Sequence, residues 1–310
     1  MAKVKTKTTY SDYDRYEHHD VRQMTPEEYL AFSLIMQTQS VSYNVAAMRI
    51  VIQRLLSSLF QSGKIKAFRT DKYGNIMAIK GSLKSGQHYP AVACHIDTVH
   101  SIVDEPKLFE WIDPIDGRRQ WFSADGIGGD DKCGIFVTLS MLANDNITAM
   151  KAFFYADEEV GAVGAKASTA DKSWYNDVGY IIEADRRGST DLIFAANGTA
   201  MASKTFKDLV IETLKPMGFS PATGSYTDVM KIQDKLNVSV MNISCGYYDP
   251  HSTTESIDES DLLAARDAVG LLITELGPAK YEHEQPKWSG GPRTSRPWPS
   301  CRRAKRPSRS

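Results

Sequence analysis

Apolar and polar positions follow one another from residue 25 to residue 276 in periods that predict alternating helices and strands. Thr25, followed by a proline and two glutamates, predicts the start of one helix, and residues 43–62 have the pattern of a second. Residues 65–81 predict two strands around a turn at Lys72–Gly74. Further segments have the apolar runs of buried strands (89–97, 150–159, 178–185 and 236–246) or helical periodicity (131–144 and 204–216). This alternation predicts an α/β fold: a three-layer sandwich with a central mixed, mostly parallel sheet covered on both faces.

The last helix and the longest connection complete the predicted body of the protein. Ser256 and Glu259 have the spacing of a capping box, and an apolar stripe from Leu262 to Leu276 follows them. Residues 101–129 form a polar connection that is longer than ordinary turns require, and such loops often build sites. We expect residues 25–282 to form a single domain.

Both ends of the chain depart from this periodic pattern. Residues 1–24 are polar and rich in tyrosine, which predicts a loosely held N-terminal arm. Residues 283–310 are basic and rich in Pro, Ser, Gly and Arg. Because such a segment cannot bury enough apolar surface to offset the entropy of ordering, we expect a disordered tail.

The charge of the chain is unevenly distributed, although its formal net value is only −1. Residues 281–310 hold eight Lys/Arg and two Asp/Glu, which leaves the remainder at −7. A mildly acidic body gives no electrostatic reason to expect nucleic-acid binding. The four cysteines have no CxxC spacing, and there is no apolar signal core and no span of 18 apolar residues. We therefore expect reduced thiols, a cytoplasmic location and no membrane partner.

Acidic and histidine side chains gather where predicted strands end or in the loops that follow. These positions are His95 with Asp97, Asp130 with Asp131, Glu158 with Glu159, Asp185, and His251. Each has an ordinary structural explanation as a turn, a capped helix start or a surface loop. Ligands of open α/β sheets bind outside the carboxyl ends of the strands, so all of these side chains could converge on one crevice.

The residue types indicate metal chemistry. Two histidines and three carboxylates suit two borderline divalent ions, with Zn²⁺ as the default and Co²⁺ or Mn²⁺ as alternatives. Five ligands for two ions require one carboxylate to bridge, which holds the ions about 3.5–4 Å apart. A further acid must take a proton from the attacking water. The adjacent Glu158 and Glu159 can supply one ligand and one base, because neighbouring side chains point in different directions.

The order of the motifs resembles that of the co-catalytic zinc exopeptidases, a family that includes aminopeptidases, tripeptidase-type enzymes and related deacylases. The resemblance covers about residues 25–276 and rests on "DKYGNIMA", "HIDTV", "GGDDKCG", "ADEEVG", "EAD" and "GYYDPHS". It implies one metal held by His95, Asp130 and Asp185. It implies a second metal held by Asp130, Glu159 and His251.

The resemblance also implies roles for three neighbours of the metal ligands. Asp97 would accept the free ring N–H of His95 and orient it. Glu158 would act as general base and then as acid towards the leaving amine. The peptide bond between Asp130 and Asp131 would be cis.

Larger members of this family carry a lid or dimerisation domain of about a hundred residues. Here 65 residues separate Asp185 from His251 and 32 separate Asp97 from Asp130, so neither gap holds a lid. We expect a lid-less domain with an open site. An oxyanion donor from a lid would be lost, and Tyr226 or Tyr247 could replace it, although a structural role is the simpler interpretation of either tyrosine.

These observations predict a metal-dependent, aminopeptidase-like exopeptidase that acts on small peptides. An N-acyl amino acid deacylase with the same metal site remains open. A catalytically inactive binding protein is a further alternative, against which the intact ligand set and Glu158 argue. The sequence leaves open the terminus attacked, the preferred side chain, the physiological metal and the oligomeric state.

Overall fold

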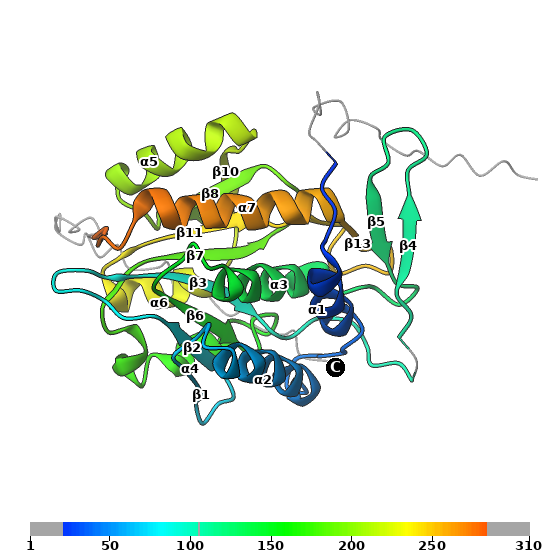
Figure 1. Cartoon of the computed structure of the whole chain (residues 1–310), viewed down its shortest axis with the longest axis horizontal. Helices are drawn as coiled ribbons and strands as arrows, with labels where there is room; N and C mark the ends of the chain where they lie inside the picture. Colours follow the sequence, from blue (N-terminus) through cyan, green and yellow to red (C-terminus); the bar gives the residue numbers. More distant parts are fainter. Residues whose placement is uncertain (1–20, 105, 284–310) are drawn as a thin grey trace, which may run out of the picture.

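A computed structural model describes residues 21–104 and 106–283. In this part of the chain a nine-stranded sheet has the order β1-β2-β6-β3-β7-β11-β8-β10, with β9 paired to β8 (Figure 1). Its strands are β1 (Ala67–Thr70), β2 (Ile76–Lys80), β3 (Tyr89–His95), β6 (Met150–Tyr155), β7 (Val178–Arg186), β8 (Asp191–Ala196), β9 (Thr199–Ala200), β10 (Ser220–Gly224) and β11 (Ser239–Ser244). A four-stranded sheet consists of β12 (Tyr247–Tyr248), β13 (Ser256–Asp258), β5 (Arg119–Phe122) and β4 (Phe109–Ile112), in that order.

The central strands of the large sheet are parallel, whereas most of the outer strand pairs are antiparallel. Strands β6, β3, β7 and β11 run parallel to one another, whereas β1–β2, β2–β6 and β11–β8 are antiparallel. Parallel neighbours end at the same edge, so the residues that follow β3, β6, β7 and β11 meet there. The predicted mixed, mostly parallel sheet is confirmed.

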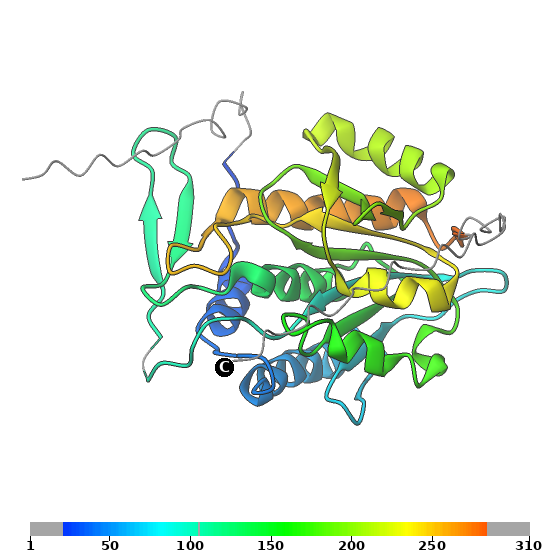
Figure 2. The same cartoon turned by 180° about the vertical axis from the view of Figure 1, so that it is seen from behind.

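Helices cover both faces of the large sheet and complete the three layers. The helices are α1 (Pro26–Met36), α2 (Ala46–Gln61), α3 (Gly129–Ala143), α4 (Val163–Ser168), α5 (Lys204–Leu214), α6 (Asp228–Leu236) and α7 (Glu259–Leu276). Figure 1 is seen from the face that carries α2, α3 and α7, whereas α4 and α6 come to the front in Figure 2. Alternate residues of β3 enter the two cores: Val92 packs on the α3 side and Ala93 on the α6 side.

The two predicted helix starts have different outcomes. Thr25 and Glu28 form the capping box of α1, with both reciprocal hydrogen bonds present. The box predicted between Ser256 and Glu259 is wrong, because Asp258 caps α7 and accepts a hydrogen bond from Asp261 N at 3.0 Å. Ser256 lies in β13, where it pairs with Phe122 of β5.

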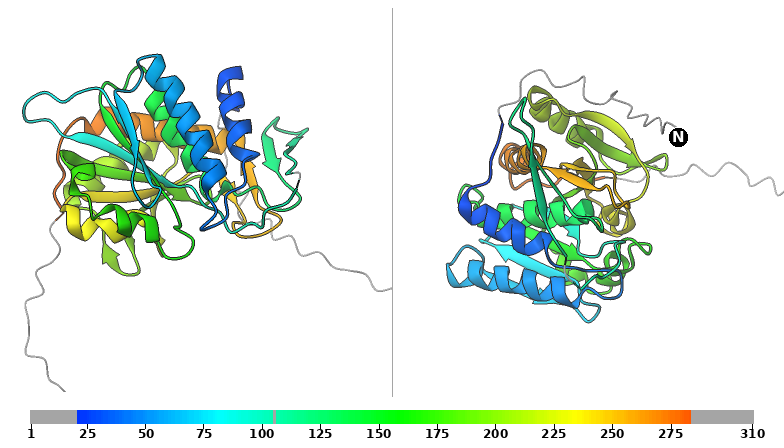
Figure 3. Two further views of the ribbon diagram at one scale, coloured as in Figure 1. Left: turned by 90° about the horizontal axis from the view of Figure 1, so that it is seen from below. Right: turned by 90° about the vertical axis from the view of Figure 1, so that its right-hand side faces the viewer.

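The long connection 101–129 is not only a loop. It contains the β4–β5 hairpin, which lies at one end of the molecule beyond α1 and α7 (Figures 1 and 3). Strand β4 is exposed along its whole length, and Phe109 stacks on Phe122 with ring centroids 5.7 Å apart. Because β4 has no buried face and β5 buries only Trp121, the hairpin has too little apolar alternation to be predicted.

The predictions for the two ends of the chain lie largely outside the described residues. At their inner limits, Met24 N donates to Glu259 Oε1 at 2.7 Å, and His283 Nε2 lies 3.0 Å from Ala200 O. The helices within residues 21–104 and 106–283 include none with the length and apolar character required to span a membrane.

Candidate active site

The predicted site residues come together at the carboxyl edge of the central strands. His95 is the last residue of β3, Asp185 lies near the end of β7, and Glu158 and Glu159 follow β6. Asp130 lies at the start of α3, preceded by Gly128 in the left-handed conformation (φ 69°). His251 follows β12 and also has positive φ (63°). The convergence predicted from strand ends is therefore present.

The carboxylate of Asp130 lies between the two histidines. Its Oδ1 is 3.0 Å from His95 Nε2, and its Oδ2 is 3.3 Å from His251 Nε2. His95 Nε2 is also 3.5 Å from Asp185 Oδ1, and His251 Nε2 is 2.9 Å from Glu159 Oε1. Each oxygen of Asp130 thus faces a different histidine, and each histidine has its own second carboxylate.

These distances fit metal coordination. Zinc bonds to nitrogen and oxygen ligands are about 2.0–2.2 Å, so two ligand atoms of one tetrahedral ion lie about 3.3 Å apart. The four nitrogen–oxygen distances span 2.9 to 3.5 Å. The atoms of His95, Asp130 and Glu159 are also close enough to one another to hold a metal ion. The histidine and carboxylate side chains present therefore fit a divalent metal.

Asp131 is a competing candidate, since it forms a similarly close group with His95 and Asp185. It is fully buried, and its oxygens accept hydrogen bonds from the backbone N–H groups of His95 (3.1 Å) and Gly134 (2.9 Å). We therefore assign to Asp131 a role in fixing the backbone and keep Asp130 as the bridging candidate. The peptide bond between Asp130 and Asp131 is cis, as the resemblance implied.

Asp97 connects His95 to the glutamate pair. His95 Nδ1 is 2.9 Å from the backbone carbonyl of Asp97 and 3.5 Å from its carboxylate, so the carbonyl is the closer acceptor. The Asp97 carboxylate accepts hydrogen bonds from the N–H groups of Glu158 (2.9 Å) and Glu159 (3.3 Å) and from the hydroxyl of Ser42 (2.7 Å). Asp97 is completely buried and thereby fixes both sides of the site.

Glu255 anchors the Asp130 loop, and the sequence analysis missed it. This buried carboxylate accepts hydrogen bonds from the backbone N–H groups of Gly128 and Asp130, both at 3.0 Å, and lies 2.5 Å from His100 Nε2. An acidic residue in a polar loop between His251 and the last helix gives no signal that separates it from a surface residue.

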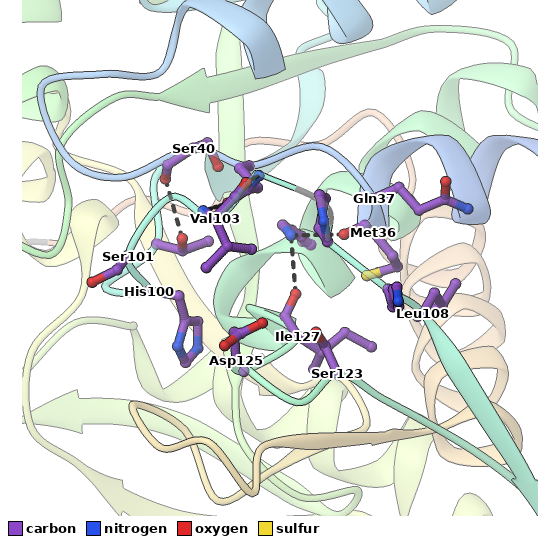
Figure 4. Close-up of a pocket in the computed structure, with 16 residues that line it drawn as sticks. Met36, Gln37, Ser40, His100, Ser101, Val103, Leu108, Ser123, Asp125 and Ile127 are labelled. Carbon is purple, nitrogen blue, oxygen red and sulfur yellow. Dashed lines mark hydrogen bonds between the residues drawn. The ribbon is translucent and has the colours of Figure 1, made fainter.

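A small cavity lies beside this anchor, away from the candidate metal ligands. It is lined by His100, Val103, Ile127 and neighbouring residues (Figure 4), and its volume of about 30 Å³ has room for about one water molecule. The ammonium group of Lys132 borders it and donates to the carbonyls of Met36 and Ile127, both at 2.9 Å. These contacts hold the loop before α3. The cavity itself is too small for a substrate.

The candidate ligands perturb one another electrostatically in the absence of metal. Burial disfavours the charged form of His95, but Asp185, Asp130 and Asp97 outweigh it and raise the pKa of His95 well above its usual range. Burial raises the pKa of Glu159 to about 7, and the hydrogen bond to Asp130 is the largest cause that raises the pKa of His251 to about 9. Metal binding must displace these protons, because histidine ligates in its neutral form.

A cleft of about 550 Å³ opens over these residues. Glu158, whose pKa is raised mainly by burial, lines it together with the candidate ligands. Tyr247 is buried, and its hydroxyl donates to Asp185 Oδ1 at 3.5 Å. The half-exposed Tyr226 borders the same cleft and extends its hydroxyl towards Gly161, next to the glutamate pair. Of the two tyrosines, Tyr226 has the freer hydroxyl.

No family model matches the chain, and no curated protein matches it either. Among solved structures, the aminopeptidase PepT of Bacillus cereus is similar with a TM-score of 0.61 and 14% identity, covering 80% of this chain and 98% of that one. A tripeptidase of Staphylococcus aureus has a TM-score of 0.59 and 13% identity, covering 81% and 98%. A protein of Thermotoga maritima described as an endoglucanase also matches, with a TM-score of 0.53, 14% identity and coverage of 79% and 99%. At these identities the likeness concerns the fold, and the predicted resemblance is confirmed at that level: the chain has the fold of the solved aminopeptidases.

Proposed function

We propose that this protein is a two-metal peptidase that hydrolyses peptide bonds of small peptides. The observation that carries the proposal is the placement of Asp130, whose two carboxylate oxygens face two separate histidines at 3.0 and 3.3 Å. A carboxylate shared in this way is what a pair of ions about 3.5–4 Å apart requires. The similarity in fold to solved aminopeptidases supports the same class of reaction.

The five predicted ligands divide into two sets around the shared aspartate. His95, Asp130 and Asp185 would hold one ion, and Asp130, Glu159 and His251 would hold the other. Bound ions at these positions would polarise the scissile carbonyl and make water nucleophilic at neutral pH. Asp97 contacts the ring of His95 through its backbone carbonyl and holds the backbone of the glutamate pair through its carboxylate, so one buried residue sets the relative position of both groups.

Glu158 is the general base in this proposal. It accepts a proton from the attacking water while the new carbon–oxygen bond forms, and it returns this proton to the amine nitrogen as the carbon–nitrogen bond breaks. Burial raises the pKa of Glu158, which suits a carboxylate that must both take up and release a proton. Tyr226, on the same cleft, is the candidate donor to the oxyanion.

The proposal is tested by metal content and hydrolysis measured on the same preparations. Metal-free protein is compared with protein reconstituted with Zn²⁺, Co²⁺ or Mn²⁺, using dipeptides, aminoacyl p-nitroanilides and N-acyl amino acids. We expect two ions per chain and chelator-sensitive hydrolysis of peptides. Faster hydrolysis of N-acyl amino acids than of any peptide would instead identify a deacylase.

Two variants compare the effect on metal content of removing the shared ligand with that of removing a surface aspartate. Asp130→Asn should lose both ions together, because both sets of ligands include it. Asp208→Asn removes an exposed aspartate of α5 and should retain both. Binding of one ion or none to wild-type protein at saturating metal, or turnover of no substrate by protein with two ions, would overturn the proposal.

A further inference from the structure

We infer that the guanidinium group of Arg187 binds a carboxylate of the substrate. The inference rests on the proposed peptidase function and specifies its substrate class: small peptides with a free carboxylate close to the bond that is cleaved. Arg187 lines the same cleft as Glu158 and the candidate metal ligands.

The backbone around Arg187 is fixed next to the reactive residues. Strand β7 ends at Arg186, and the carbonyl of Arg187 accepts a hydrogen bond from the Ser244 hydroxyl at 2.8 Å. The next residue, Gly188, donates its N–H to the carbonyl of Tyr247, also at 2.8 Å. Arg187 is two residues beyond Asp185 in the sequence, so their Cα atoms lie at most about 7 Å apart. This separation corresponds to at most about two residues of an extended bound peptide.

The two neighbouring arginines differ in their pairing. Arg186 forms an ion pair with Asp191, with nitrogen–oxygen distances of 2.9 and 3.1 Å. Arg187 is exposed, and no carboxylate among the side chains that the structure describes lies within 4.0 Å of its guanidinium. A planar guanidinium recognises a carboxylate through two parallel hydrogen bonds, and here that capacity is unused by the described part of the chain.

The remaining charges in the cleft favour an anionic group at this position. The acidic residues among the described lining are the three candidate metal ligands Asp130, Glu159 and Asp185, together with the base Glu158. In the proposed site each of these four carboxylates either holds a metal ion or acts as the base. None of the four is therefore left to pair with a substrate ammonium group. A substrate carboxylate, in contrast, could pair with Arg187 without displacing a carboxylate of the described side chains.

A carboxylate in this position could come from two parts of a peptide, and paired substrates distinguish them. Ala-Ala compared with Ala-Ala amide tests the C-terminal carboxylate, and Glu-p-nitroanilide compared with Gln-p-nitroanilide tests an acidic side chain. We expect wild-type protein to prefer the acid in one of these pairs by about 10- to 100-fold in kcat/KM, the range of a charge-assisted hydrogen bond. Arg187→Gln should abolish this preference by slowing the acid and leaving its neutral partner within about threefold.

Two further variants control for charge and for folding. Arg187→Lys retains the charge without the planar fork, so part of the preference should remain. Arg54→Gln removes an exposed arginine of α2 and should change neither substrate of a pair. Melting temperatures establish that each variant is folded. Equilibrium binding of the same peptides to Glu158→Gln protein, with and without Arg187→Gln, gives the same comparison without turnover.

The outcomes separate this inference from the proposed function. If wild-type protein cleaves acid and neutral partners equally, or if Arg187→Gln slows both members of a pair equally, Arg187 does not bind the substrate carboxylate while the peptidase proposal stands. If protein that holds two ions cleaves none of the peptides, both are overturned. Loss of the preference for one acid with retention of the neutral partner supports the inference and identifies which carboxylate is bound.

Discussion

The substitution Glu158→Gln tests the assignment of the base most directly. Glutamine has nearly the same size but cannot accept the proton of the attacking water. The backbone N–H of residue 158 remains bonded to Asp97 Oδ1 at 2.9 Å, because the substitution leaves the main chain unchanged. The site should therefore retain its geometry, and only the proton transfer should be lost.

The expected loss is large and confined to turnover. Removing a general base typically costs about 10²–10⁴-fold in rate, which is about 3–5 kcal/mol of activation free energy. Stability should not suffer. The pKa of Glu158 is raised by burial first, with Asp130 and Asp97 adding to the rise, so its ionised form is disfavoured in the folded protein. A neutral glutamine avoids this penalty, and metal-free Glu158→Gln protein should melt no lower than wild type at neutral pH.

The neighbouring substitution Glu159→Gln is the matched comparison. Its carboxylate oxygen lies 2.9 Å from His251 Nε2, and the two side chains would hold the same metal ion in the proposed site. This variant should bind one ion more weakly, and excess metal should restore part of its activity. The assay is kcat on the best peptide, with metal content from the same samples. The reasoning is refuted if Glu158→Gln loses metal, or if its turnover stays within tenfold of wild type.

Three further predictions concern protons, the missed anchor and the tail. In metal-free protein the pKa values of Glu159 and His251 are raised from 4.5 and 6.5 to about 7 and about 9, so the folded state binds protons more tightly than the unfolded state. The melting temperature should then fall as pH rises from 6 to 9 and should fall less with Zn²⁺ present; an unchanged pH profile on adding zinc contradicts this. Glu255→Gln weakens the acceptor of Asp130 N and should reduce metal affinity by about 10–100-fold in a competition titration, whereas wild-type affinity would show that the anchor is dispensable. Deleting residues 284–310 should leave the melting curve unchanged, and a drop of more than about 4 °C, or about 1 kcal/mol, would show that the tail packs on the body.

The position of the site could be predicted because its residues lie at the ends of strands or just after them. His95 and Asp185 follow strongly apolar runs, and an α/β sheet brings the ends of such runs to one edge. The residue types then limited the chemistry to carboxylate and imidazole ligands. Five ligands for two ions required one shared carboxylate, and the family resemblance implied that it is Asp130. The distances on either side of the Asp130 carboxylate agree with this.

Other features had no periodic signal in the sequence. Glu255 acts through backbone N–H groups of a distant loop, and a contact of that kind leaves no spacing to detect. Strand β4 buries neither face, so its residues do not alternate. The start of α7 was misplaced because Ser256 and Asp258 are both good capping residues, and pairing of Ser256 with Phe122 decided between them.

The order in which the site residues occur along the chain has a consequence for folding. His95 ends the third strand, whereas His251 follows β11, the last strand of the large sheet, and Glu255 comes later still. A growing chain therefore cannot assemble both ligand sets until almost the whole domain has been synthesised. In the proposed two-metal site, binding of the second ion should consequently occur late and stabilise the finished sheet, not nucleate its formation. For the same reason, a chain that stalls before residue 251 would lack His251, a ligand of the second ion in the proposed two-metal site.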